Sequence, residues 1–459
     1  MSVPKPILPP AISAVARPYS RWPFAFGPRF FLVLLVGLIW LGPAWWEWRF
    51  LAAMAVWDLL ALAAWATDLR RLPQPQQVEV RRVWLRPAAL DTPSSVRVEI
   101  SSRVPVPLRV EALDDVPVAL RSEPPRLELR VAARAPARGD YAIHPRQRGD
   151  AQLGNVFLRY QSPWRLAERW AAAPLAQTVR VYPSLEEAKR HLLYLIRARQ
   201  TELEKRLRRQ RGHGREFDCL REYRDGDEFR DICWTATARR GKLITRVYQV
   251  ERSQTLWLVL DAGRLLRARV GALTKLDHAA NAALGLAQVA LHSGDRVALL
   301  AYGRAPQHLV PPANGRAHLR VLLERLAQVQ AQPFEADHLR AAQTLLTAQK
   351  QRALVVWITD LAETAATPDV IESVQQLTRR HLVLFLVIGQ PEMAALAAAR
   401  PADAVQMYRY VAAQEVVHRR EVLLRQLRQH GALALQVDAG RLSTALVNHY
   451  LQIKERALL

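Results

Sequence analysis

The stretch TLWLVLDAG, residues 255–263, carries the pattern that decides the fold of the C-terminal half of this chain. Consecutive apolar residues lead to an aspartate, and then a helical pattern and a second apolar run, DRVALLAYG at residues 295–303, follow. The same scheme continues through RALVVWITD, HLVLFLVIG and ALALQVD. Strands that are apolar almost throughout and alternate with helices are typical of a mostly parallel sheet covered on both faces. We therefore predict a doubly wound α/β domain over residues 253–457.

Two acidic residues, Asp261 and Asp360, come directly after apolar strands of this predicted domain. In open α/β sheets, ligands bind beyond the carboxyl ends of the strands. The two carboxylates are therefore the candidates for metal binding or for chemistry. The structural alternative for each is that it caps a loop or a helix start at the edge of the sheet.

Residues 76–182 show a different pattern, in which short runs of alternating apolar and polar residues are interrupted by proline, as in QVEVRRVWLRP and SVRVEISSRVPVPLRVEAL. Period-2 alternation at this spacing predicts an antiparallel, β-sandwich-like domain of an immunoglobulin-like kind. No catalytic pattern accompanies these strands. His144 and its neighbouring arginines fit a solvated strand end better than an anion site.

Two apolar runs precede the β-rich region, at residues 30–46 and 50–66. Each run would form a helix of about 25 Å, at the short end for crossing a bilayer, and together they predict a transmembrane helical hairpin over residues 30–66. Basic residues flank the hairpin on both sides, whereas the break between the runs carries only Arg49. The positive-inside rule then places residues 1–29 and the C-terminal part in the cytoplasm. We expect a multi-pass protein of the bacterial inner membrane, because a cleaved signal peptide would not be followed by a second apolar run.

A heavily basic segment follows at residues 184–212. Ser184 and Glu187 have the spacing of a capping box, and the apolar spacing behind them predicts a long amphipathic helix. Beside a membrane, each basic side chain contributes about 1 kcal/mol of attraction to anionic lipid. The side chains expected at the membrane surface are Arg197, Arg199, Lys205, Arg206, Arg208, Arg209 and Arg211.

The whole chain is basic, with 65 Lys and Arg against 42 Asp and Glu and a net charge of +23. Such a charge attracts nucleic acid, acidic protein or anionic lipid. Because no zinc finger or RNP-like aromatic motif accompanies it, lipid is the expected partner and nucleic acid is not. A hydrophobic content of 50% excludes a disordered chain. The two cysteines are typical of reduced thiols rather than of a disulfide framework.

Acids and arginines gather most densely in residues 214–251, which begin GREFDCLREYRDGDEFRDICW. Interleaved arginines would keep the carboxylates ionised and paired, which predicts an ion-pair network. Apolar anchors, Phe229 among them, would dock this segment on the α/β domain, either to staple domains together or to bind a partner. The residues expected to form this surface are Phe217, Leu220, Arg221, Tyr223, Gly226, Asp227, Arg230, Ile232, Trp234 and Arg239.

An enzyme interpretation of the same segment takes Asp227 or Asp231 as general base and Cys219 or Cys233 as nucleophile. A nucleophilic cysteine needs an adjacent base or a lowered pKa. His213 is the nearest histidine in sequence, in a glycine-flanked stretch with no orienting partner. Two small buried cysteines are the commoner arrangement.

The stretch FDCLREYRDGDEFRDICWTATARRGKL resembles the signature of the bacterial family called "domain of unknown function 58". The strand ending at Asp261, the SGDRVALLAYG segment and the strand ending at Asp360 resemble a von Willebrand factor A domain. In that family, a pair of membrane helices, a β-rich region and such a domain occur together. The resemblance therefore implies the same multidomain architecture as the patterns above.

A metal-binding von Willebrand domain carries Asp-x-Ser-x-Ser after its first strand, and a threonine and a second aspartate on other loops. Asp261 and Asp360 match the two aspartates, whereas Gly263 and Leu265 stand at the serine positions and Ala336 falls near the threonine position. Mg²⁺ requires several oxygen ligands in octahedral array. The motif is incomplete, so we expect no cofactor unless other groups replace the missing hydroxyls.

The family resemblance implies a companion of MoxR-type AAA+ ATPases. We therefore expect a non-enzymatic, membrane-anchored scaffold or adaptor that assembles or matures client proteins beside such an ATPase. The chain has no Walker A pattern, so ATP-driven work would belong to the partner. Two alternatives stay open: a membrane-bound metal-dependent or cysteine hydrolase, and a membrane-tethered nucleic-acid-binding protein.

Overall fold

The computed structural model describes residues 8–133, 135–184, 216–224, 227, 229–249, 254–361 and 367–456. The chain divides into two compact units, Met1–Tyr182 and Pro183–Leu459. It is a multidomain α/β protein with several separate sheets. The predicted basic helix and its arginines lie outside the described residues.

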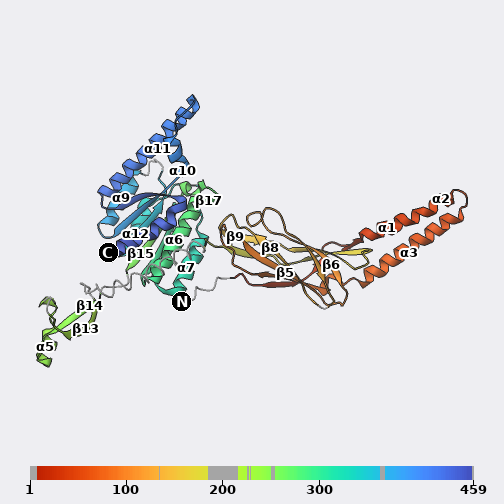
Figure 1. Ribbon diagram of the computed structural model, residues 1–459, viewed down its shortest axis with the longest axis horizontal. Coiled ribbons are helices and arrows are strands. Elements are labelled where there is room, and N and C mark those ends of the chain that lie inside the picture. Colours follow the sequence, from red (N-terminus) through yellow and green to blue (C-terminus); the bar gives the residue numbers. More distant parts are fainter. Residues whose placement is uncertain are drawn as a thin grey trace. The chain divides into compact units, whose positions relative to one another are not determined.

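The N-terminal unit consists of antiparallel sheets, with apolar helices between its third and fourth strands (Figure 1). One sheet has the order β1–β4–β5–β8, and the other has the order β2–β11–β10–β6–β7, in which β3 also pairs with β11. A separate ladder joins β9 to β12. The strands are β1 (Ile12–Val15), β2 (Arg17–Pro18), β3 (Phe24–Phe26), β4 (Val78–Trp84), β5 (Ser94–Ser102), β6 (Leu108–Asp114), β7 (Arg126–Val131), β8 (Ala137–Ile143), β9 (Gly149–Leu153), β10 (Val156–Gln161), β11 (Ala167–Ala173) and β12 (Gln177–Val181).

Alternating burial explains why these segments form half-buried strands. In β5, for example, Val96, Val98 and Ile100 are fully buried, while the residues between them are half-exposed. The structure extends this unit beyond the predicted range, because the first 29 residues contribute β1, β2 and β3 to its two larger sheets. Their runs of two to four residues are too short to show a period in the sequence.

The apolar runs of this unit form α1 (Pro28–Gly37), a 3₁₀ turn (Leu38–Trp40), α2 (Leu41–Ala44) and α3 (Arg49–Arg71). Helices α1 and α3 lie side by side (Figure 1), and the indole of Trp57 donates to the Val33 carbonyl at 2.9 Å. Gly37 allows this approach, since a Cβ there would lie 2.6 Å from the Trp57 ring. Within the described residues, α3 alone is long and apolar enough to cross a membrane, and Pro28–Ala44 is a shorter apolar helical stretch.

The C-terminal end of α3 is fixed to the sheets by a buried carboxylate. Asp68 accepts hydrogen bonds from the Ser162 hydroxyl at 2.6 Å and from the backbone amides of Leu166 and Ala167 at 3.1 and 2.9 Å. The Arg71 guanidinium lies 4.5 Å above the Trp164 ring. The apolar helix is therefore joined rigidly to the loop between β10 and β11.

The C-terminal unit contains a six-stranded sheet of order β19–β18–β15–β20–β21–β22. All neighbours are parallel except β18 and β19. The four central strands, β15, β18, β20 and β21, are buried almost throughout, which explains their near-continuous apolar sequence, whereas the edge strands β19 and β22 are partly exposed. The strands of this unit are β13 (Glu216–Glu222), β14 (Ile244–Gln249), β15 (Thr255–Asp261), β16 (Arg269–Val270), β17 (Leu273–Thr274), β18 (Arg296–Tyr302), β19 (Pro306–Ala313), β20 (Leu354–Thr359), β21 (Leu382–Gly389) and β22 (Leu433–Asp438).

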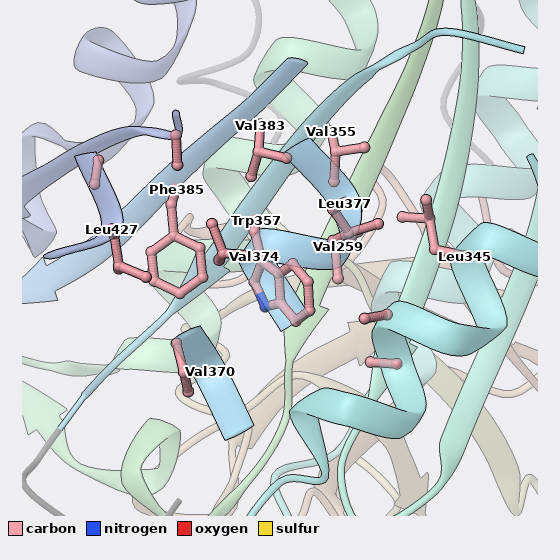
Figure 2. Packing of buried hydrophobic residues seen from close by; sticks show 14 of the residues in the cluster. Val259, Leu345, Val355, Trp357, Val370, Val374, Leu377, Val383, Phe385 and Leu427 are labelled. Atoms are coloured by element: carbon pink, nitrogen blue, oxygen red, sulfur yellow. The ribbon is translucent and has the colours of Figure 1, made fainter. Parts of the chain in front are cut away.

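Helices cover both faces of this sheet. On one face, α6 packs against β15, β18, α7 and α12, and on the other, α8, α9 and α11 enclose an apolar core. Figure 2 shows this core, in which the rings of Trp357 and Phe385 lie 5.8 Å apart among Val374 and Leu427. The helices of this unit are α5 (Trp234–Arg240), α6 (Lys275–His292), α7 (Gly315–Gln328), α8 (His338–Ala348), α9 (Thr367–Thr378), α10 (Pro391–Ala398), α11 (Ala404–Gln429) and α12 (Leu442–Glu455).

Candidate functional site

The two predicted site carboxylates lie at the same edge of the large sheet. Asp261 is the last residue of β15, and Asp360 directly follows β20, its parallel neighbour. The chain runs from β15 to β18 on one side of β15 and then to β20 on the other side. This reversal is the topological switch point at which open α/β sheets bind ligands. The prediction that the two aspartates mark this edge agrees with where the structure places them.

Asp261 is buried and hydrogen-bonded through both carboxylate oxygens. Oδ1 accepts from the Gly263 amide at 2.7 Å, and Oδ2 accepts from the Thr359 hydroxyl at 2.6 Å. Burial raises the pKa of Asp261, and the neighbouring Asp360 raises it further. The charge of His338 and the two hydrogen bonds lower the pKa and so offset part of this rise.

Asp360 is buried between two cations. The Lys275 ammonium, from the first residue of α6, donates to Oδ2, and the Arg420 guanidinium, from α11, donates to Oδ1 at 2.9 Å. Arg420 also donates to the Leu361 carbonyl at 3.0 Å. Lys275 is 2% exposed and Arg420 is 9% exposed, so this ion-pair cluster is held away from solvent. It joins α6, the end of β20 and α11 at one point.

An aromatic chain lies beside Asp261. The hydroxyl of Tyr302 accepts a hydrogen bond from the Trp357 indole at 2.7 Å and contacts Nδ1 of His338 at 2.8 Å. Burial, followed by the charge of Asp261, raises the pKa of Tyr302 well above its usual value. Tyr302 is therefore neutral, and its hydroxyl serves as a hydrogen-bonding link between β18, β20 and α8 rather than as an acid or base.

The residues at this edge do not fit a Mg²⁺ ion. Protein donors occupy the oxygens of both Asp261 and Asp360, and two cations, Lys275 and Arg420, are already bound to Asp360. A Cβ at Gly263 would lie 2.9 Å from the Ala336 amide nitrogen, so a serine is sterically blocked there. Among the described residues, no group of three or more His, Cys, Asp or Glu side chains could hold a metal ion. No catalytic step through a metal follows from this geometry.

Three residues of this site were not predicted from the sequence: Lys275, Arg420 and Thr359. Lys275 offered a signal, because a lysine in the first turn of a helix opposes the helix dipole and needs a reason to be there. Arg420 offered none, since it stands in HRREVLLRQ among other charged residues.

The segment predicted as a docking surface forms a β-hairpin of β13 and β14 with α5 between them. Arg221 pairs with Asp227 at 2.7 Å, and the Arg224 amide donates to the same carboxylate at 2.9 Å. The hydroxyl of Tyr223 donates to the Asp227 carbonyl at 3.2 Å. Arg230 and Arg239 lie exposed nearby in the sequence, whereas Gly226 and the side chain of Phe217 fall outside the described residues.

The predicted apolar anchors of this segment differ in burial. Ile232 is buried, but Phe229 is 74% exposed, Trp234 is 65% exposed and Leu220 is also exposed. The sequence pattern did not predict which of these apolar side chains would be buried. The hairpin is too small to bury all of them.

Cys233, one of the two candidate nucleophiles, caps the N-terminus of α5 and is 6% exposed. A hydrogen bond with the Thr235 hydroxyl, followed by one with the Ala236 amide, lowers the pKa of its thiol to about 7. Cys219 is described only in its backbone, as part of β13, and His213 lies outside the described residues. Among the described residues, no histidine or carboxylate is hydrogen-bonded to Cys233, and the hydrolase alternative stays an untested prediction.

The chain thus combines an antiparallel, two-sheet unit carrying apolar helices with a doubly wound α/β unit preceded by a hairpin. Residues 219–405 match the family described as "Protein of unknown function DUF58", so the chain carries a domain of that family. The match begins within β13 and ends in the first turn of α11, and it leaves the N-terminal unit uncovered.

Curated relatives match a stretch of similar length. The uncharacterized proteins Mb1516 of Mycobacterium bovis and Rv1480 of Mycobacterium tuberculosis are each 26% identical over 182 residues, which is 39% of this chain and 56% of theirs. The chain therefore matches little more than half the length of these relatives.

Solved structures show only a distant likeness. BatB from Bacteroides thetaiotaomicron has a TM-score of 0.32 and 12% identity, over 45% of this chain and 100% of that chain. Proximal thread matrix protein 1 from the mussel byssus has a TM-score of 0.29 and 11% identity, over 43% and 46%. These scores are too low to define a shared fold.

Proposed function

We propose that this protein is a non-enzymatic scaffold anchored in the bacterial inner membrane, whose C-terminal unit is a von Willebrand factor A-like domain. The observation that carries the proposal is the exposed apolar surface of α3. Only 6% of its most apolar stretch, which is long enough to cross a membrane, is buried by the protein. Leu59 and Leu60, for example, are more than half exposed. An apolar helix that the protein does not cover requires a lipid or protein environment.

The flanking charges support a hairpin with both ends in the cytoplasm. Arg29 lies at the start of α1, and Arg70 and Arg71 lie in the last turn of α3, whereas Arg49, the first residue of α3, is the one basic residue at the opposite end of the hairpin. Basic residues are retained on the cytoplasmic side of a membrane. Because Asp68 fixes the end of α3 to the sheets, the anchor would hold the N-terminal unit rigidly at the membrane surface.

The protein-binding surface in this proposal is the outer half of α11 together with α10, which pack against each other (Figure 1). The inner half of α11 is fixed by Arg420, Leu424 and Leu427, which are buried. The exposed apolar side chains of the outer half and of α10 are Leu396, Val405, Met407, Tyr408, Val411 and Val416.

Tyr408, 80% exposed, is the best candidate for a contact of high energy, since aromatic side chains are enriched at the centres of protein interfaces. The partner we propose is a MoxR-type AAA+ ATPase. The support is that the stretch FDCLREYRDGDEFRDICWTATARRGKL resembles the family "domain of unknown function 58", whose members are companions of such ATPases. The scaffold would present client proteins to that ATPase, which would supply the ATP hydrolysis.

The test is site-specific photo-crosslinking in native membranes. A photoreactive phenylalanine analogue replaces Tyr408, and Thr347, which is exposed on α8, carries the same analogue as the matched control. We expect an AAA+ ATPase to be crosslinked at position 408 and not at position 347. Failure to recover one, in cells shown to express a MoxR-type ATPase, would contradict the partner assignment.

The anchor is tested separately. Reporter fusions at the C-terminus should report a cytoplasmic location, and alkaline extraction should leave the protein in the membrane pellet. A periplasmic signal would overturn the orientation, and release by alkali would overturn the anchor.

A further inference from the structure

Two buried carboxylates, Asp261 and Asp360, and two buried cations, Lys275 and Arg420, lie at this edge of the sheet. Asp261 and Asp360 lie at adjacent strand ends, and the charge of Asp360 raises the pKa of Asp261. Both cations pair with Asp360, whereas Asp261 accepts hydrogen bonds from the Gly263 amide and the Thr359 hydroxyl. The positive charge that a divalent ion would supply at such an edge is therefore already present in the side chains.

The position of Lys275 is costly by two physical measures, and the helix does not require it. A lysine is almost never fully buried unless it is paired, and Lys275 is 2% exposed. It lies in the first turn of α6, where the helix dipole disfavours a cation. The same turn already has its capping box, in which Thr274 and Asp277 satisfy each other's backbone amides, so Lys275 is not needed to begin the helix. A side chain retained at such a cost indicates a specific need for its charge.

We propose that the Lys275 ammonium is the built-in cation of this edge and stands in the place of a divalent ion, so that the edge keeps its structure without metal. Its loss would leave Asp360 with Arg420 as its one paired cation, beside the second carboxylate at the neighbouring strand end. The Thr359 hydroxyl, bonded to Asp261, would then complete a set of three oxygen ligands, and water would supply the rest, as is usual for Mg²⁺ and Mn²⁺. Removing Lys275 therefore creates a divalent-cation site. This inference does not depend on the proposed scaffold role.

The experiment measures Mn²⁺ binding to the full chain in detergent, by electron paramagnetic resonance of free Mn²⁺ and by thermal unfolding with Mg²⁺ or with EDTA. For the wild-type protein we expect no Mn²⁺ uptake and the same Tm in both conditions. For Lys275→Ala we expect a lower Tm in EDTA, Mn²⁺ uptake at least about tenfold tighter than in the wild type, and a rise in Tm of about 5 °C at saturating Mg²⁺. Adding Asp261→Asn to this variant should abolish the uptake.

Lys454→Ala is the matched control. Lys454 donates to the buried Asp295 at 2.7 and 2.8 Å, but no second carboxylate is bonded into that contact. This variant should also lose stability, yet it should gain neither Mn²⁺ uptake nor a Mg²⁺-dependent Tm. A comparable gain in Lys454→Ala would overturn the proposal, because the effect would then be one of general destabilisation.

Two further outcomes would overturn it. One is a folded Lys275→Ala chain that takes up no Mn²⁺. The other is wild-type uptake of Mn²⁺ that is lost in Asp261→Asn, which would place the ion beside Lys275 rather than in its stead. If Lys275→Ala does not fold, Lys275→Gln takes its place in the experiment, because it keeps a long side chain without the charge. Uptake of Mn²⁺ by the wild-type chain would contradict the proposal whether or not either variant folds.

Discussion

Each unit of this protein buries an ion-pair centre, and the two centres are built differently. In the N-terminal unit, Arg82 of β4 reaches Asp114 of the opposite sheet, with its Nε 3.0 Å from the carboxylate. Its remaining N–H groups donate to the carbonyls of Leu175 at 2.7 Å and Gly154 at 3.0 Å. The Tyr141 hydroxyl, whose pKa is raised by burial, donates to Asp114 at 2.7 Å. One arginine therefore pairs with one aspartate, and main-chain carbonyls accept hydrogen bonds from the other N–H groups of the arginine.

The centre in the C-terminal unit brings like charges together instead. Asp261 and Asp360 lie at the switch point of the sheet, where Asp360 pairs with both Lys275 and Arg420, while His338, the Thr359 hydroxyl and the Gly263 amide lower the raised pKa of Asp261. A structural ion pair has no reason to collect two carboxylates, because each one adds a desolvation cost. The difference separates a pair that joins two sheets from a cluster in which two cations pair with one of two neighbouring carboxylates.

The largest predicted effect comes from breaking the simpler centre. Arg82→Ala leaves Asp114 buried without its cation, which should cost about 3–5 kcal/mol of the free energy of unfolding. Hydrogen-exchange mass spectrometry of the full chain should localise the loss of protection to peptides of β4, β6 and β8, while peptides of β15 and β20 keep theirs.

Arg97→Ala is the control for this variant. Arg97 pairs with Asp140 at 2.7 Å in the same sheet, but both side chains are substantially exposed, so the loss should be much smaller than in Arg82→Ala. Equal losses in the two variants would show that burial does not determine how much each ion pair contributes to the free energy of unfolding. A neutral, volume-matched pair, Arg82→Met with Asp114→Leu, should recover most of the stability, as befits a purely structural contact.

An effect of intermediate size tests how tightly the residues around Asp261 are packed at the edge of the large sheet. Gly263→Ser adds a side chain whose Cβ would lie 2.9 Å from the Ala336 amide nitrogen and 3.0 Å from the Ala336 Cβ, so the loop must shift, at a cost of about 1–3 kcal/mol. The φ of Gly263 is −76°, so the cost comes from contact and not from backbone strain.

Gly440→Ala is the matched control, because nothing lies within 4 Å of a Cβ built at Gly440. Both variants are compared by urea unfolding followed through tryptophan fluorescence. A Gly263→Ser chain as stable as Gly440→Ala would mean that the edge has room for the missing hydroxyl ligand of a metal site.

The sequence predicted β15, β18, β20, β21 and β22 of the large sheet, the first four because burial on both faces leaves a nearly continuous apolar run. It did not predict the edge strand β19, whose sequence PQHLVPPA contains prolines and is only partly buried. It also placed Asp261 and Asp360 together, since parallel strands end at a common edge. It could not identify Arg420, because the side chains of a charged helix carry no mark of which one turns inward. Nor could it identify the exposure of Phe229 and Trp234, which depends on what the rest of the chain covers.

The smallest predicted effect concerns pH. Burial holds the pKa of Asp261 above its unfolded value of about 3.9, so the folded chain binds a proton there more readily than the unfolded chain does. Its contribution to stability is therefore complete below the unfolded pKa and is lost as the pH rises through the raised folded pKa. Asp261→Asn removes this titration while keeping an oxygen that can accept from the Gly263 amide.

We therefore expect Asp261→Asn to be destabilised at acid pH relative to the wild type and to approach or exceed wild-type stability near neutral pH. The measurement is the difference in Tm between the two chains across that range, with Asp140→Asn as the reference. Asp140 is held at a lowered pKa by a hydrogen bond from Arg97, so its contribution has the opposite sign and is lost as the pH falls. If Lys275 and Arg420 fully compensated both carboxylates of the edge, Asp261→Asn would show no pH dependence relative to the wild type. A slope of the predicted sign would instead mean that the two cations chiefly serve Asp360, which is how their hydrogen bonds are directed.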